Sequence, residues 1–166
     1  MFKRIGLYGA AALAGVICAV IFFGIFTITT VTGSGMEPAL ADGTPVLINK
    51  LAYRAGDSEP KVGQVVAFPS DVYGEEGEGK ILVRRIAGVP GDVIEIRDNI
   101  FYRNDRPYTE YMAEAVHLED MERTQLGENQ LFLLSDNRKS SMDSRNEAIG
   151  TVSLKECIGK VCLPIL

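Results

Sequence analysis

One long uncharged segment limits what this chain can fold into: from Ile5 to Met36 it has no acidic, basic or histidine side chain. A helix of about 20 apolar residues spans a bilayer core and satisfies its own backbone hydrogen bonds. The segment is longer than the apolar part of a cleavable signal sequence, which is about 7–15 residues, and no Ala-x-Ala site follows it. It therefore predicts a transmembrane helix over residues 5–31.

Charge predicts the orientation of that helix. Lys3 and Arg4 precede the apolar segment, and the next charged residue is Glu37. Because basic residues favour the cytoplasmic side, we expect residues 1–4 to form a cytoplasmic tip and residues 32–166 to lie outside the plasma membrane. The chain has 17 basic and 22 acidic residues, a net charge of -5. It lacks the basic surface of nucleic-acid-binding proteins, so we expect contact with membrane lipid and none with nucleic acid.

The outer segment is typical of a β-rich domain. Short runs of branched and aromatic residues alternate with turns rich in Gly, Pro and Asp, and these runs include PVLINKLAY, QVVAF, ILVRRIAGV, DVIEIR, IFYRN and QLFLLS. This spacing predicts a mainly β fold, in which one transmembrane helix precedes a largely antiparallel coiled sheet or barrel. The acidic residues 110–128 are compatible with a short helix or with an exposed charged surface.

The cysteines and the single histidine predict no metal or cofactor site. Cys157 and Cys162 would point to opposite faces of an extended strand, so we expect free thiols rather than a disulfide. His117 lies in the acidic stretch, where an exposed side chain is expected, and no other residues with metal-ligand spacing accompany it.

Four segments carry motifs in a fixed order. They read VTGSGMEPAL at Val31–Leu40, VGQVVAF at Val62–Phe68, RRIAGVPGD at Arg84–Asp92 and SDNRKSSMDSR at Ser135–Arg145. In this order they resemble the V-x-G-x-S-M-x-P-T-L, G-D-x-V-x-F, K-R-x-x-G-x-P-G-D and G-D-N-R-x-x-S-x-D-S-R motifs of type I signal peptidases. These S26-like enzymes are membrane-anchored serine proteases that remove signal peptides with a Ser-Lys dyad. The resemblance covers nearly the whole chain.

Both dyad positions differ from the family pattern. Gly35 stands where the family has its catalytic serine, and Arg84 stands where it has the general-base lysine. Glycine has no nucleophilic side chain, and an arginine keeps its proton. The pattern therefore predicts that no catalytic dyad is intact. Ser34 is a weak substitute nucleophile, because on an extended segment its side chain would point to the face opposite that of residue 35 unless a bulge intervenes.

The resemblance implies that the other motif residues support the shape of the site. Asp136, Arg138, Asp143 and Arg145 are expected to form an ion-pair and hydrogen-bond lattice with Arg85, and Ser141 is expected to face Arg84. The remaining supporting residues are Met36, Pro38, Gly88, Pro90, Gly91, Asp92 and Asn137.

A signal-peptidase-like groove without a dyad would bind exported precursor proteins without cleaving them. In this loss the chain resembles signal-peptidase-like proteins that assist pilus assembly in Gram-positive bacteria, so pilin subunits are the expected partners. Three alternatives stay open. The chain is an active signal peptidase using Ser34 with an unrecognised base, an active enzyme in which Gly35 and Arg84 are laboratory replacements, or a passive tethered β domain that binds no peptide.

Overall fold

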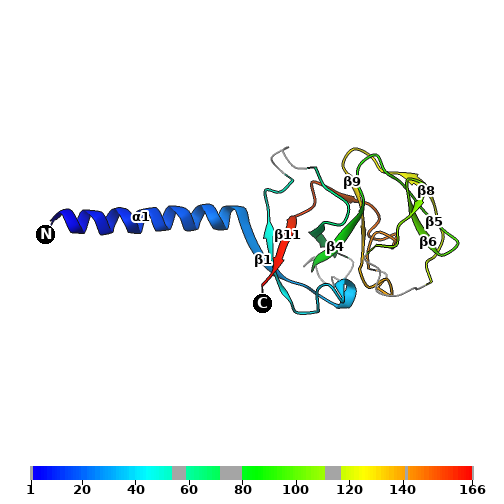
Figure 1. Ribbon diagram of the computed structural model, residues 1–166, viewed down its shortest axis with the longest axis horizontal. Helices are drawn as coiled ribbons and strands as arrows, with labels where there is room; N and C mark the ends of the chain where they lie inside the picture. Colours follow the sequence, from blue (N-terminus) through cyan, green and yellow to red (C-terminus); the bar gives the residue numbers. More distant parts are fainter. Residues whose placement is uncertain (1, 54–58, 72–79, 111–116, 141, 166) are drawn as a thin grey trace.

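A helix projects from a β domain in the computed structural model (Figure 1). The structure describes residues 2–53, 59–71, 80–110, 117–140 and 142–165. Helix α1 comprises Phe2–Ile25, and its far end carries the N-terminus. Judged on these described residues, the structure contains no helix with the length and apolarity that a membrane crossing requires.

The predicted helix boundary is wrong at its C-terminal end. Helix α1 ends at Ile25, and strand β1, Phe26–Thr30, follows directly and pairs antiparallel with β2, Pro45–Asn49. The sequence of β1 is FTITT, and branched side chains of this kind favour extended backbone. Apolarity alone cannot distinguish such a strand from a continuing helix, so the prediction for residues 5–31 extended too far.

Two antiparallel sheets form the β domain, which confirms the mainly β prediction. The larger sheet has the order β1-β2-β11-β3-β4-β9-β10, and the smaller has the order β7-β6-β5-β8. In the larger sheet the further strands are β3 Val65–Ser70, β4 Lys80–Gly88, β9 Gln130–Leu134, β10 Val152–Ser153 and β11 Gly159–Pro164. The smaller sheet comprises β5 Val93–Arg97, β6 Ile100–Arg103, β7 Arg106–Pro107 and β8 Met121–Gln125.

The acidic stretch contains no helix in its described part. Residues 117–120 are irregular, and Met121–Gln125 form the edge strand β8. Most of these side chains, including that of His117, are exposed, as the charged-surface alternative expects. Residues 111–116 lie outside the described residues.

Strand β4 connects the three parts of the hydrophobic core. Ala87 belongs to the cluster between the two sheets, Leu82 and Ile86 to a second cluster around β9, and Val83 to a third around Met36. Arg84 lies in the middle of this strand and is also buried. The fold therefore holds the position expected for the general base within its most densely packed strand.

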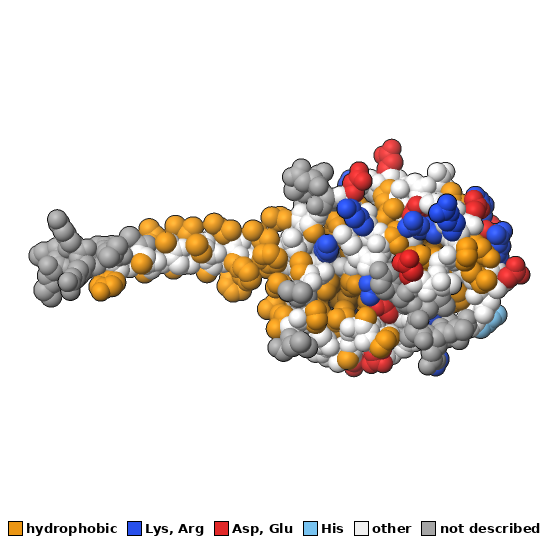
Figure 2. Space-filling model, viewed as in Figure 1, with side chains coloured by type: hydrophobic (Ala, Val, Ile, Leu, Met, Phe, Trp, Pro, Cys, Tyr) orange, Lys and Arg blue, Asp and Glu red, His pale blue; other side chains and the backbone are white. Residues whose placement is uncertain are grey.

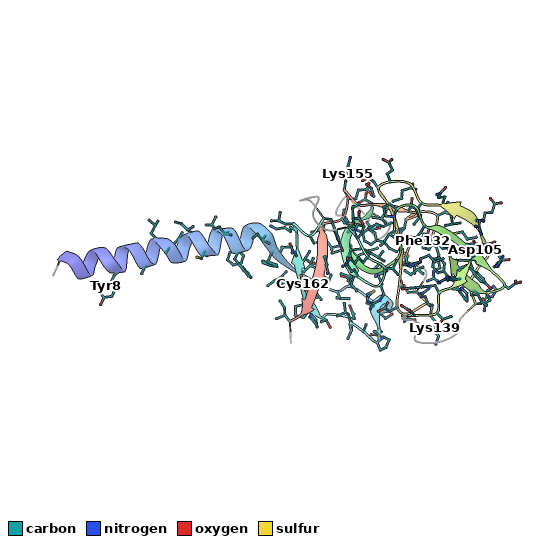
Figure 3. All side chains as sticks on the ribbon, turned by 45° about the horizontal axis from the view of Figure 1, so that its top comes forward. Tyr8, Asp105, Phe132, Lys139, Lys155 and Cys162 are labelled. Carbon is teal, nitrogen blue, oxygen red and sulfur yellow. The ribbon has the colours of Figure 1, made fainter. Side chains whose placement is uncertain are left out.

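Cys157 and Cys162 are free thiols, as expected. Cys157 is buried against the second core cluster, whereas Cys162 lies exposed on β11 (Figure 3).

Candidate functional site

The segment that carries Gly35 is a tight turn held by the loop that follows it. Gly33 N–H donates to Asp42 Oδ1 at 2.7 Å, and Val31 N–H donates to Thr44 O at 2.9 Å. Residues Ser34–Met36 form one 3-10 turn, and Met36 is fully buried. The extended backbone expected for this segment is wrong, because these hydrogen bonds to Asp42 and Thr44 impose the turn. Ser34 is exposed while Gly35 is buried, so the two neighbours differ in environment.

Arg84 occupies the space beside Gly35. A Cβ atom on Gly35 would lie 3.0 Å from Arg84 Cζ, 3.0 Å from Nη2 and 3.1 Å from Nη1. These separations are shorter than an ordinary van der Waals contact. The guanidinium group therefore fills the volume that a side chain at position 35 would need.

Hydrogen bonds hold this guanidinium group in place. Arg84 is only 2% exposed, its Nε donates to Met142 O at 2.7 Å, and its Nη1 donates to Val83 O at 2.6 Å. Hydrogen bonds from a charged donor are stronger than neutral ones. Arginine offers donors and no acceptor, so this group can hold carbonyl oxygens but cannot take a proton from a hydroxyl.

Asn137 joins the third motif to the first. Its backbone N–H donates to Gly35 O at 3.0 Å, and its Nδ2 donates to Ser34 O at 3.2 Å. The structure thus brings Gly35, Arg84 and Asn137 together from three separate segments of the chain. Ser141, which was expected to face Arg84, lies outside the described residues.

Two buried ion pairs support the loop of the third motif. Arg85 donates through Nε and Nη2 to both carboxylate oxygens of Asp136, at 2.7 and 2.6 Å. Arg145 makes the same kind of two-point contact with Asp143, at 2.8 Å for each bond. Asp143 also accepts a hydrogen bond from Ser135 N–H at 2.8 Å. These contacts fix the loop that positions Asn137.

Arg138 joins this lattice through its backbone carbonyl, which accepts from Arg145 Nη1 at 3.1 Å. Within the described part of the chain, its Nε and Nη1 are buried and have no hydrogen-bond acceptor. Burial lowers the pKa of Arg138, and the nearby Asp143 carboxylate opposes that effect.

The Pro-Gly turn after β4 is built around Asp92. Its two carboxylate oxygens accept from Val89 N–H at 3.0 Å and from Asn104 Nδ2 at 2.7 Å. Gly91 has φ +85°, a conformation that glycine adopts without strain. A Cβ on Gly88 would lie 2.8 Å from Leu126 Cδ1, so a larger residue there would have to displace the end of the Leu126 side chain. Pro90 lines a shallow hollow beside this turn.

Sequence reasoning missed several partners at the site. In the described part of the chain, Arg84 donates to the backbone carbonyls of Met142 and Val83, which have no side-chain signal. Asn104 is different, because its place in the turn RNDRP is typical of a side chain that bonds to nearby backbone. Pro38, which follows a cis peptide bond, is exposed and contributes only to the course of the turn.

Comparisons with known proteins give the family of the chain. Residues 4–166 match the family described as signal peptidase, peptidase S26. Signal peptidase IB of Staphylococcus aureus is 30% identical over 168 residues, covering 90% of this chain and 83% of the relative. Signal peptidase I P of Bacillus subtilis subsp. natto is 33% identical over 139 residues, covering 78% of this chain and 71% of the relative. A crystal structure of a signal peptidase I from Enterococcus faecalis V583 is similar to 63% of this chain and 98% of that chain, with 25% identity and a TM-score of 0.48. The chain belongs to the signal peptidase family, peptidase S26.

Proposed function

We propose that this protein binds exported precursor proteins at a signal-peptidase-like site and does not cleave them. The observation that carries the proposal is the guanidinium group of Arg84, which lies in the space where a side chain at position 35 would stand. Gly35 supplies no nucleophile, and a side chain at that position would have to displace the guanidinium group by a few tenths of an ångström.

The chemistry of peptide cleavage supports this proposal. Cleavage by covalent catalysis requires a hydroxyl or thiol and a group that accepts its proton. Gly35 supplies no such group, and Arg84 is a protonated donor whose hydrogen bonds already join β4 to Met142. A bound peptide would therefore meet a site that can hold its backbone but cannot attack it.

An active peptidase is the competing function, and the names of the relatives fit it equally well. It would use the exposed Ser34, whose backbone carbonyl Asn137 holds. This alternative also needs a proton acceptor beside Ser34. The experiment below therefore includes Ser34→Ala.

We also propose that α1 anchors the β domain in the plasma membrane, with its N-terminus in the cytoplasm. The exposed apolar side chains of the helix support this placement: Leu13, Val20 and Phe23 are 63%, 67% and 68% exposed. Figure 2 shows hydrophobic atoms along the helix and on the end of the β domain that adjoins it. Lipid contact would remove this apolar surface from water.

Our proposal for the binding partner also rests on the loss of the dyad. We propose a precursor with small residues near its cleavage site, and a pilin precursor in particular. An extended peptide of this kind binds by adding to a sheet edge, which supplies backbone hydrogen bonds without chemistry. The choice of pilin rests on analogy with dyad-less members of the family.

A photo-crosslinking experiment tests the proposal. The full chain in detergent is mixed with a pilin precursor that carries a photoreactive residue beside its Ala-x-Ala site. After irradiation, the masses of the products are measured by mass spectrometry. We expect a crosslinked adduct with the mass of the intact precursor. A precursor with Trp in place of both Ala residues is the control and should not crosslink.

Two results would overturn the proposal. Release of the mature protein, lost in Ser34→Ala, would show an active peptidase. Equal crosslinking of the intact and the Trp-substituted precursors, or none of either, would show a domain without a peptide site.

A further inference from the structure

We infer that a second site, between β8 and residues 138–151, binds a ligand that carries one carboxylate on an apolar body. This pocket, here called the Arg138 pocket, has a volume of about 950 Å³. Arg138 and Lys139 contribute charge to it, and Ile94, Ile96 and Phe132 contribute apolar walls. Neither Gly35 nor Arg84 lines it.

The state of Arg138 points to a missing acceptor. Its side chain is only 4% exposed, and in the described part of the chain its Nε and Nη1 donate to nothing. Buried polar groups in folded proteins normally have hydrogen-bond partners, and burial of a cation whose donors have no acceptor lowers the stability of the fold. The described residues contain no hydrogen bond from Nη2 either. Unlike Nε and Nη1, Nη2 is not among the buried atoms without a partner, so it is the nitrogen that a ligand in the pocket can reach.

The two nearest carboxylates are already engaged. Both oxygens of Asp136 accept from Arg85, and both oxygens of Asp143 accept from Arg145. Asp143 accepts from Ser135 N–H as well. Because the described residues supply no acceptor for Arg138 Nη2, a ligand in the pocket can supply one.

The residues that line the pocket determine which kind of anion it can bind. Ile94, Ile96 and Phe132 are each at most 2% exposed, whereas Met121, which also lines the pocket, is half-buried and offers apolar surface that a ligand can reach. Figure 3 shows Phe132 in the interior of the β domain and Lys139 at its surface. The exposed carboxylates at the rim belong to Glu119, Asp120 and Glu147. They would repel a polyanion, so the pocket suits a single carboxylate rather than a phosphate group.

Binding of a matched pair of probes to the full chain in detergent tests this inference. N-acetylphenylalanine carries one carboxylate and an aromatic body, and N-acetylphenylalaninamide has the same body without the charge. We expect the acid to bind at least tenfold more tightly than the amide in isothermal titration, and inorganic phosphate to bind more weakly than the acid.

Two variants assign the binding to this pocket. Arg138→Gln should weaken binding of the acid at least tenfold. Because loss of a buried guanidinium can unfold the loop, Thr124→Trp is a second variant: Thr124 lies exposed on β8 at the pocket, and an indole there would obstruct it without touching Arg138. Lys155→Gln is the control, because Lys155 lies on the opposite side of the β domain from Lys139 in Figure 3.

Equal binding of acid and amide, tighter binding of phosphate, or binding of the acid that Thr124→Trp leaves unchanged would overturn the inference. None of these outcomes depends on precursor capture, because Gly35 and Arg84 lie outside the pocket.

Discussion

At the scale of single residues, Gly35 and Arg84 depend on each other. The guanidinium group fills the space beside Gly35, and only the absence of a Cβ allows it to do so. The two departures from the family pattern are therefore one structural change. A serine restored at position 35 alone would meet a buried group that is held by Met142 and Val83.

We predict that Gly35→Ser destabilises the unaltered chain by about 1–3 kcal/mol, the usual cost of overpacking. The free energy of urea unfolding measures this effect. In an Arg84→Lys background the same change should cost clearly less, because lysine lacks the planar group that meets the new Cβ. Gly127→Ala is the matched control, since there the close atom is the flexible end of Gln130. Additive effects of the two substitutions would contradict the coupling.

We predict that Asp136→Asn destabilises the fold by about 3 kcal/mol, because it leaves the buried Arg85 cation without its counter-charge. The exposed Arg123–Asp105 pair offers the comparison, and Asp105→Asn should leave the unfolding midpoint unchanged. Thermal unfolding of both variants checks the contrast. Similar losses of stability in the two variants would mean that burial does not determine how much the Arg85–Asp136 pair contributes to stability.

Sequence reasoning located these residues but not their contacts. The motifs indicated positions 35 and 84 because residue types at fixed spacing carry that information. They could not show that Arg84 lies against Gly35, since its acceptors are backbone carbonyls. Nor could they show that Nε and Nη1 of Arg138 lack acceptors in the described part of the chain, because that depends on which side chains Asp136 and Asp143 already bind.

At the scale of elements, β11 closes the larger sheet between β2 and β3. Gly159 starts this strand, and a Cβ there would lie 2.2 Å from Asn49 O on β2. Gly159 also pairs with Ala67 of β3, so the neighbouring strand limits any shift. Only a glycine allows the three strands to meet.

Gly159→Ala should therefore destabilise the β domain by about 2–3 kcal/mol or more, because backbone atoms would have to move apart. The free energy of urea unfolding, followed by circular dichroism, measures the loss. Lys160→Ala, at the next position of the same strand, is the control and should change stability much less. Equal effects would show that β11 tolerates displacement at its start.

The elements show where sequence patterns succeed and where they fail. Runs of branched residues predicted the strands because period and composition mark a half-buried sheet. The change from α1 to β1 at Phe26 was hidden because helix and strand there are both uncharged. The turn at Ser34–Met36 depends on hydrogen bonds donated to Asp42 and Thr44 and on bonds donated by Asn137, which no local pattern contains.

At the scale of the whole molecule, ionisation of buried groups sets the alkaline limit of stability. Burial raises the pKa of Cys157 from 9.0 to about 12, and the charge of Glu156 adds to this effect. Above pH 9 the unfolded chain loses the thiol proton while the folded chain keeps it, so the unfolded state gains. Stability should be retained below pH 9 and fall as the pH rises towards 12.

Comparing two cysteine variants tests this prediction. Cys157→Ala should show a smaller loss of stability between pH 8 and 10 than the unaltered chain, whereas Cys162→Ala, which changes an exposed thiol, should show the same loss. Tyr53, whose pKa burial also raises, adds a further loss of the same sign at higher pH. Identical pH dependence in all three proteins would contradict the assignment to Cys157.

We propose that the fold keeps a signal-peptidase-like site, and that only the residues at positions 35 and 84 prevent this site from cleaving a peptide. The most direct test is a cleavage assay in detergent on a precursor with an Ala-x-Ala site, in which the unaltered chain is compared with the double variant Gly35→Ser, Arg84→Lys. We expect the double variant to release the mature protein and the unaltered chain to leave the precursor intact. Cleavage by the unaltered chain, or by neither protein although both are folded, would contradict the claim.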